Sequence, residues 1–177
     1  MSYSDNLLLN GNLEYNALTN WTVSNIEMGA ISGTGEKYFK LAATASMFQS
    51  VSALAFLLQP LDCLVSFKFR LEEAVEATDS TVDAYVLLEY HYEETDVDVF
   101  ALPIVQAFLP SEEKNDGIWY SFTCTCPLKV DAILQYINVS IITKNLGASC
   151  FVREVNLQRN LDPTEAHNNS VNPHNLP

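Results

Sequence analysis

Basic residues are scarce in this sequence. It contains 9 Lys and Arg against 22 Asp and Glu, which gives a formal net charge of −13 at pH 7. A surface of this sign repels phosphate groups, and no basic stripe interrupts it. The composition therefore predicts a protein that binds neither nucleic acid nor an anionic membrane. Solubility explains the charge, with calcium or a basic partner as the alternative.

Long apolar runs are also missing. The first six residues carry no positive charge, and Leu7-Leu8-Leu9 is much shorter than the apolar core of a secretion signal. No apolar stretch approaches the length of a transmembrane helix. We therefore expect synthesis in the cytoplasm without a cleaved signal, with release by a route such as cell lysis as the alternative.

The sequence has four cysteines, and their spacing is not that of a zinc site. Cys124 and Cys126 are separated by one residue, whereas a structural zinc site uses pairs separated by two. Reduced, buried thiols are the expectation for a chain without a signal. The alternative is cross-linking between the subunits of a durable assembly, through Cys63, Cys124, Cys126 and Cys150.

Signatures of catalysis are absent as well. The sequence contains no phosphate-cradling glycine loop, nucleophile elbow or zinc helix motif. His91, His167 and His174 lack a neighbouring nucleophile or metal-ligand pattern. Glu93 and Glu94 fall in an expected turn, which favours a solvated turn over a glycosidase pair. The protein is therefore predicted to be no enzyme and to need no cofactor.

What the sequence does contain is β periodicity. Residues 63–71 alternate most clearly, and we expect Cys63, Val65, Phe67, Phe69 and Leu71 to face the core. A hairpin is predicted from two strands, 133–142 and 150–158, around a turn at 144–147. In the second of these strands, simple alternation places Cys150, Val152, Glu154, Asn156 and Gln158 opposite Phe151, Arg153, Val155 and Leu157. Further strands are predicted at 21–23, 26–30, 38–41, 47–51, 82–92, 97–104 and 119–126.

About ten short strands without a convincing amphipathic helix predict an all-β fold. The expected architecture is an antiparallel two-sheet sandwich of the jelly-roll type, spanning residues 1–158 as one domain. Residues 159–177 contain three prolines, five asparagines and few apolar groups. We predict that they form a polar, extended or disordered C-terminal tail.

The opening of the chain resembles a known family. Asn6-Leu7-Leu8-Leu9-Asn10-Gly11-Asn12-Leu13-Glu14, followed by Trp21, is similar to the start of carbohydrate-binding-module-like jelly rolls, which are galactose-binding-like sandwiches. Segments that match later parts of this pattern occur in the same order at 48–51, 64–70, 119–123 and 151–157. The layout also resembles the N-terminal sandwich of collagen-like surface proteins of spore-forming bacteria, although no Gly-X-Y repeat follows.

This resemblance implies that the chain binds sugars. Members of the family stack exposed aromatic rings on sugar faces and hold the hydroxyls with amide and carboxylate groups. The corresponding ligand-binding candidates are Tyr85, Glu89, Gln135, Tyr136 and Asn138. The alternative for the tyrosines is packing within the sheet, because strands are generally enriched in aromatic residues.

The resemblance also implies a structural calcium ion, held by the opening Glu and by an Asp in the last strand. The matching positions are Glu14 and the pair Arg153-Glu154, so that Arg153 stands where the Asp is expected. A cation disfavours bound calcium, and a guanidinium binds a carboxylate bidentately. We hypothesise an ion pair between Glu14 and Arg153 in place of the metal. Calcium held by Glu14 and Glu154 is the alternative.

Two functions follow from these observations. The favoured one is a structural protein that self-assembles through its sandwich, as a homo-oligomer in a lattice, an inclusion or a spore surface. The absence of a signal and the exposed edge strand expected at 97–104 favour this function. Carboxylates crowded at the contacts would make such an assembly sensitive to pH. The alternative is a carbohydrate-binding module that recognises a polysaccharide.

Overall fold

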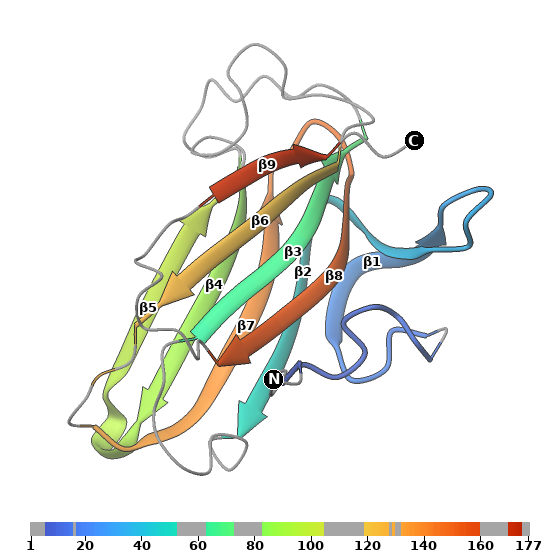
Figure 1. Ribbon diagram of the computed structural model, residues 1–177. Helices are drawn as coiled ribbons and strands as arrows, with labels where there is room; N and C mark the ends of the chain where they lie inside the picture. Colours follow the sequence, from blue (N-terminus) through green and yellow to red (C-terminus); the bar gives the residue numbers. More distant parts are fainter. Residues whose placement is uncertain are drawn as a thin grey trace.

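The computed structural model describes residues 6–15, 17–52, 63–72, 83–104, 119–127, 129, 132–159 and 170–174 (Figure 1). Within these residues the strands are β1 (Thr22–Ala30), β2 (Lys37–Ser52), β3 (Cys63–Leu71), β4 (Asp83–Tyr92), β5 (Val97–Pro103), β6 (Trp119–Cys126), β7 (Leu134–Lys144), β8 (Cys150–Arg159) and β9 (Ser170–His174). A 3₁₀ turn, η2 (Glu93–Thr95), joins β4 to β5. The described part of the chain has no helix that is long and apolar enough to cross a membrane.

All strand pairs are antiparallel, in the order β5-β4-β7-β2-β8-β3-β6-β9, and β1 pairs with β2. Residues 45–52 of β2 pair with β7, whereas residues 39–41 pair with β8. The strand therefore passes from a first sheet, which contains β7, β4 and β5, into a second sheet, which contains β8, β3, β6 and β9 (Figure 1). This architecture confirms the predicted all-β sandwich of the jelly-roll type.

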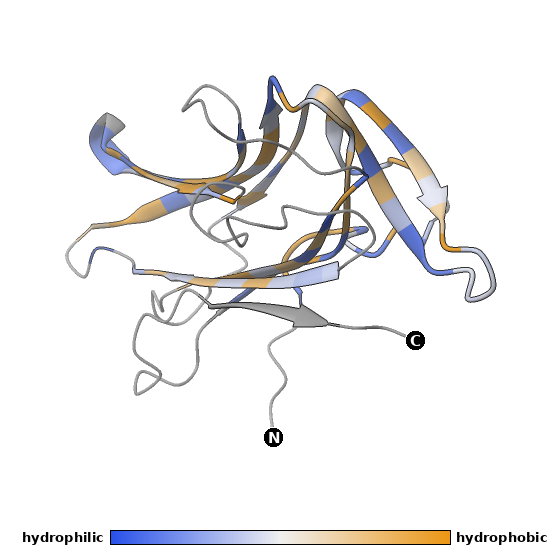
Figure 2. Cartoon of the chain, turned by 90° about the horizontal axis from the view of Figure 1, so that it is seen from above, coloured by the Kyte–Doolittle hydropathy of each residue, from blue (hydrophilic) through white to orange (hydrophobic). Residues whose placement is uncertain are grey.

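The core lies between the two sheets. Cys63, Val65, Phe67, Phe69 and Leu71 of β3 are all buried, as their alternation predicts. Figure 2 shows hydrophobic and hydrophilic residues alternating along the strands. Each large apolar side chain contributes about 1.5–3 kcal/mol when it is buried fully, so this pattern holds each strand in one orientation.

Strands β1 and β2 are longer than the sequence predicts. The separate strands expected at 21–23 and 26–30 form one strand, with a register shift between Ser24 and Ile26. Asn25 sits at this shift with φ 55° and donates a hydrogen bond from Nδ2 to Thr44 O at 2.9 Å. The strands expected at 38–41 and 47–51 are likewise continuous. The alternation of buried and exposed side chains weakens between the two predicted segments, because β2 passes from one sheet to the other there.

Strand β8 contains a bulge that breaks its simple alternation. Ser66 pairs with Asn156 while Lys68 pairs with Arg153, so Phe67 of β3 faces two residues of β8. One of these two, Glu154, has φ 53°, a conformation that L-residues seldom adopt in a strand. The prediction of simple alternation was therefore wrong beyond Arg153. The extra residue turns Val155 and Leu157 toward the core, together with Cys150 and Val152.

The opening segment is tied to β8 by hydrogen bonds. Asn6 Oδ1 accepts from Leu157 N at 2.9 Å, and Asn6 Nδ2 donates to Val155 O at 3.0 Å. A Cβ on Gly11 would lie 2.0 Å from Val155 O, so this position requires glycine. Asn10 is buried, and its Nδ2 donates to Ala17 O at 2.8 Å. The residues that carry the family resemblance thus close one edge of the second sheet.

The segment predicted as a tail includes strand β9, which pairs with β6 through residues 170–174. The remainder of the predicted tail, His167 included, lies outside the described residues. The predicted division into a domain at 1–158 and a tail at 159–177 stays a prediction.

Candidate functional site

The register of β4 and β7 places four polar or aromatic residues together on the outward face of the first sheet. His91 pairs with Tyr136, and Glu89 pairs with Asn138. Because alternate residues of a strand point to one face, the four side chains share that face. We call Glu89, His91, Tyr136 and Asn138 the sheet-face cluster. The same two rows continue across the neighbouring strands, through Val97 and Val99 of β5 and Ser50 and Ser52 of β2.

The sheet-face cluster is held by direct contacts. The rings of His91 and Tyr136 stack with their centroids 4.2 Å apart and an interplanar angle of 16°. Asn138 Nδ2 lies 3.3 Å from Glu89 Oε2 and 3.1 Å from His91 Nε2. Because an amide nitrogen only donates, this arrangement places the proton of a neutral imidazole on Nδ1. Asn138 Oδ1 is buried and has no hydrogen-bond partner among the described residues.

Three of the five predicted sugar-binding residues meet in this cluster, namely Glu89, Tyr136 and Asn138. Tyr85 pairs with Ile142 and lies four residues from Glu89 along β4, which is about 13 Å in a strand. Gln135 is exposed at a register shift, and no hydrogen bond joins it to the cluster. His91 was not among the predicted sugar-binding residues. Its position two residues after Glu89 in an alternating strand is the signal that could have identified it.

A second cluster lies on the outward face of the second sheet, and sequence analysis missed it. The Arg70 guanidinium lies 4.4 Å from the ring centroid of Phe151 and 5.4 Å from that of Trp119. Arg153 lies 4.6 Å from the Trp119 ring, and the Tyr38 ring is 4.8 Å from Phe151. We call Tyr38, Lys40, Arg70, Trp119, Phe151 and Arg153 the cation–aromatic cluster. The sequence signal for this cluster is the pair of basic residues, Lys68 and Arg70, that alternation places on the outward face of strand 63–71.

Arg153 binds Glu36 rather than the predicted Glu14. Its Nη1 donates to Glu36 Oε2, while the side chain of Arg153 is only 2% exposed. Among the described residues no ion pair joins Glu14 to Arg153, and Glu14 is exposed. The predicted partner is therefore corrected. Glu36 precedes β2 directly, and the β1–β2 connection carries it to Arg153, which sequence separation does not reveal.

Glu154 lies beside the same ion pair, in a crevice of about 230 Å³. Its Oε1 is 2.9 Å from Lys68 Nζ and 3.6 Å from Arg153 Nε. Lys37 also lines this crevice and donates from Nζ to Leu13 O at 3.3 Å. These cationic groups disfavour a divalent cation by charge repulsion. Calcium binding through Glu14 and Glu154 stays a prediction.

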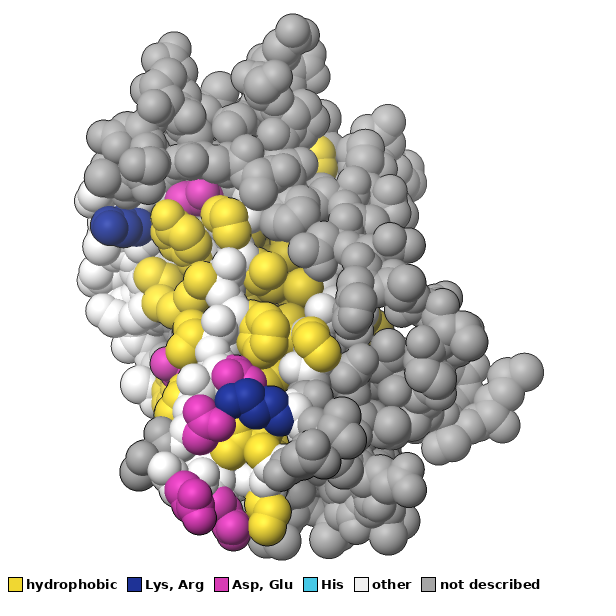
Figure 3. Space-filling view, turned by 90° about the vertical axis from the view of Figure 1, so that its left-hand side faces the viewer, with side chains coloured by type: hydrophobic (Ala, Val, Ile, Leu, Met, Phe, Trp, Pro, Cys, Tyr) yellow, Lys and Arg dark blue, Asp and Glu magenta, His cyan; other side chains and the backbone are white. Residues whose placement is uncertain are grey.

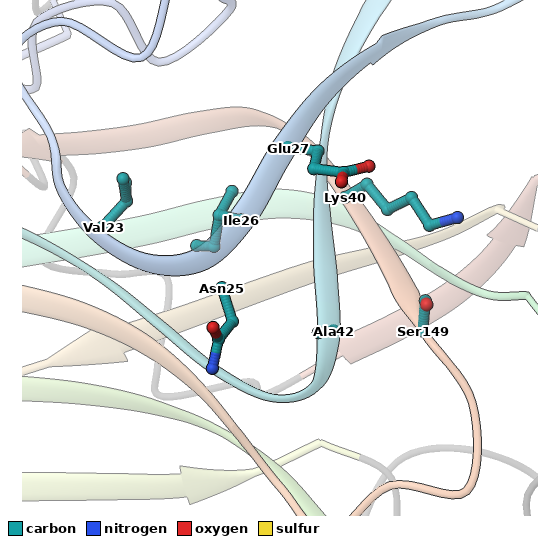
Figure 4. Close-up of a pocket in the computed structure, with 7 residues that line it drawn as sticks. All are labelled: Val23, Asn25, Ile26, Glu27, Lys40, Ala42 and Ser149. Carbon is teal, nitrogen blue, oxygen red and sulfur yellow. The ribbon is translucent and has the colours of Figure 1, made fainter.

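A larger crevice of about 590 Å³ opens between β1, β2 and the start of β8 (Figure 4). It lies beside the register shift in β1, and Asn25 and Ile26 contribute to its wall. Lys40 lines the crevice and also lies 5.9 Å from the Phe151 ring. The crevice therefore adjoins the cation–aromatic cluster.

The four cysteines are buried thiols, and none is more than 2% exposed. Cys124 Sγ and Cys126 Sγ lie 3.7 Å apart. Their contact raises the pKa of Cys126, which burial raises further, and it lowers the pKa of Cys124. Burial also raises the pKa of the Cys150 thiol. A cross-link between chains would require the strands to separate, so this burial opposes the predicted cross-linking role.

Strand β5 ends the sheet order and presents apolar side chains. Val97 is 38% exposed and Val99 is 57% exposed. Figure 3 faces the side of the molecule on which β5 lies and shows hydrophobic side chains running along it. At one end of β5, Lys129 Nζ lies 2.7 Å from Asp96 Oδ2 and 3.0 Å from Asp98 Oδ1.

No protein-family model matches the chain, and no curated protein matches it. Solved structures do share its fold. The carbohydrate-binding module TmCBM61, in complex with β-1,4-galactotriose, superposes with a TM-score of 0.53 and 16% identity over 89% of this chain and 100% of that chain. A family 16 carbohydrate-binding module has a TM-score of 0.56 and 19% identity over 86% of this chain and 99% of that chain.

A third similar structure is the enzymatically active domain of tailspike protein 4 from bacteriophage CBA120. It has a TM-score of 0.58 and 12% identity over 88% of this chain, but the match spans only 21% of the tailspike chain. At these identities the likeness concerns the fold alone. The comparisons therefore confirm the predicted carbohydrate-binding-module-like sandwich.

Proposed function

We propose that this protein is a non-catalytic carbohydrate-binding module and that the sheet-face cluster is its sugar site. The observation that carries the proposal is the stacked pair of His91 and Tyr136 beside the Asn138 amide, which Glu89 and His91 hold in place. Modules of the same fold support it, since TmCBM61 is seen in complex with β-1,4-galactotriose.

The cluster supplies both kinds of contact that sugar recognition needs. His91 covers one face of the Tyr136 ring, and Tyr136 is 36% exposed, so the opposite ring face can stack on the C–H groups of a sugar. Glu89 lies within the same two rows and can accept hydrogen bonds from sugar hydroxyls. Asn138 contacts both Glu89 and His91 through Nδ2, and so positions the groups that face the ligand.

A glycan array followed by calorimetric titration tests this site. We expect Tyr136→Ala and Asn138→Ala each to weaken binding of the best neutral oligosaccharide at least tenfold, or about 1.4 kcal/mol. Tyr85→Ala is the matched control, because it removes a tyrosine from the same face outside the cluster and should leave the affinity unchanged. No binding on the array, or equal affinity of Tyr136→Ala and the parent, would refute the proposal.

Self-assembly through β5 is the second candidate function. Its support is the apolar edge formed by Val97 and Val99, together with Lys129, which pairs with the acidic residues that would otherwise repel a second copy. Light scattering at pH 5, 7 and 10 tests it. We expect a particle that forms at pH 7, that is lost in Val99→Lys, and that reductant leaves intact. A monomer under every condition would end this proposal.

A further inference from the structure

Basic residues gather on the second sheet although the chain is strongly acidic. The sequence has nine Lys and Arg in total. Four of them extend from the outward face of this sheet on β2, β3 or β8, namely Lys40, Lys68, Arg70 and Arg153. Solubility explains acidic residues spread over a surface, but it does not explain cations collected on one face.

Three of these four cations have an oxygen partner. Lys40 Nζ lies 3.2 Å from Glu72 Oε1, and the contacts of Lys68 and Arg153 are those described above. Arg70 differs, because no hydrogen bond or ion pair joins it to the described residues, and its Nε is buried without a partner. The carboxyl of nearby Glu72 bonds to Ser149 and Lys40, which lower its pKa, and the charge of Arg70 lowers it further without a direct bond. Among the described residues, no carboxylate therefore forms an ion pair with Arg70.

Two buried rings fix the orientation of this guanidinium. Phe151 and Trp119 are 4% and 5% exposed, and Arg70 lies against both, at 4.4 and 5.4 Å from their centroids. A guanidinium held over aromatic rings keeps its in-plane N–H groups available as donors. Since Nε is buried, the donors that remain are the two terminal nitrogens. Two parallel N–H donors match the two oxygens of one carboxylate.

We propose that Arg70 is a carboxylate-binding site and that its ligand is a uronic acid unit of a glycan. The sugar class rests on the proposed carbohydrate-binding function, whereas the carboxylate preference rests on Arg70 itself. Lys40 lies 5.9 Å from the same Phe151 ring that Arg70 contacts, and Lys40 also lines the 590 Å³ crevice (Figure 4). Arg70 is not part of the crevice wall, so the crevice adjoins the Arg70 site through Lys40. This site lies on the second sheet, apart from the sheet-face cluster.

Calorimetry with short oligosaccharides tests the proposal, because a long polyanion would be repelled by the net charge of the protein. The probes are trigalacturonate and β-1,4-galactotriose, which differ in their carboxylates and in the configuration of their linkages, so the comparison that decides is between variants on the same probe. We expect Arg70→Gln and Arg70→Lys to weaken trigalacturonate binding at least tenfold. Arg70→Lys retains the charge and lacks the two-donor fork, so its loss identifies bidentate recognition. Lys144→Gln is the control, since it removes one positive charge from the first sheet and should have no effect.

The outcomes separate this site from the proposed function. Unchanged trigalacturonate affinity in Arg70→Gln would overturn the carboxylate site, whatever Tyr136→Ala does to galactotriose binding. Equal affinity of the parent protein for succinate and trigalacturonate would overturn the sugar assignment. Loss of trigalacturonate binding in Arg70→Gln, with galactotriose binding retained, supports the site. That result would stand even if Tyr136→Ala had no effect and the sheet-face cluster failed as a sugar site.

Discussion

Glu36→Gln is expected to lower the free energy of unfolding by about 1.5–3 kcal/mol, the range for a hydrogen bond to a charged group. The substitution removes the anionic partner of Arg153, whose side chain is 2% exposed. Removing one partner of a fully buried pair costs about 3–5 kcal/mol. Glu36 is itself 52% exposed, so water screens part of the interaction and the expected loss lies below that range.

Two matched variants separate this effect from a general loss of surface charge. Glu72→Gln breaks the pair with Lys40, in which both side chains are more than a third exposed, and should cost about 0–1 kcal/mol. Glu14→Gln removes a carboxylate that has no ion pair with Arg153 and should change stability by less than about 0.5 kcal/mol. Urea unfolding followed by tryptophan fluorescence measures all three, provided that the m-values agree.

The order of the three losses decides the argument. If Glu14→Gln cost more than Glu36→Gln, the predicted pair between Glu14 and Arg153 would be the one that forms in solution. If Glu36→Gln cost no more than Glu72→Gln, burial of Arg153 would not strengthen its ion pair. Either result would refute the inference that burial of Arg153 makes its ion pair with Glu36 more stabilising than an exposed pair.

Four further predictions follow from backbone geometry, burial and charge. Gly11→Ala should destabilise the protein by about 1–3 kcal/mol in urea unfolding, because the new Cβ would meet Val155 O; unchanged stability would contradict this close approach. Glu154→Gly should be about 1 kcal/mol more stable than Glu154→Ala, because φ 53° favours glycine; the reverse order, usual in strands, would exclude the bulge. Burial raises the pKa of the Cys150 thiol in the folded protein. The stability that this shift contributes is therefore complete below the ordinary thiol pKa, and it is lost as pH rises toward the pKa of the folded state. Cys150→Ala should therefore flatten the alkaline fall in stability by up to about 1.4 kcal/mol per pH unit, and an unchanged slope would contradict this. Micromolar calcium should leave the unfolding temperature unchanged, because cations line the crevice around Glu154; a large upward shift would restore the calcium site.

The strands could be predicted where large apolar residues alternate without interruption. Strand 63–71 is the clearest case, since each second side chain is buried and the period is a local property of the chain. The prediction failed where a strand meets more than one partner. At Glu154 a bulge inserts one residue, and in β2 the chain changes sheets. Neither event can be identified from the local sequence alone, because both depend on the neighbouring strands.

The sheet-face cluster could be predicted in part. Glu89, Tyr136 and Asn138 were identified by residue type and strand face, but their contact depends on the register of β4 against β7. A register shift of two residues would leave every side chain on the same face of the sheet, but it would separate His91 from Tyr136 and Glu89 from Asn138. His91 was set aside because the sequence shows no catalytic or metal-ligand partner near it, and its ring partner in the structure, Tyr136, is 45 positions away.

The sequence by itself determined that this chain forms an acidic, antiparallel β-sandwich, because alternation and composition act residue by residue. Only the tertiary structure decided which side chains meet. Arg70, Trp119 and Phe151 come from three different strands, and Arg153 reaches Glu36 across 117 positions. Contacts of this kind follow from sheet order and register, which arise when the two sheets pack around a shared core. The candidate sites are therefore properties of the folded protein and have no signature in any single segment.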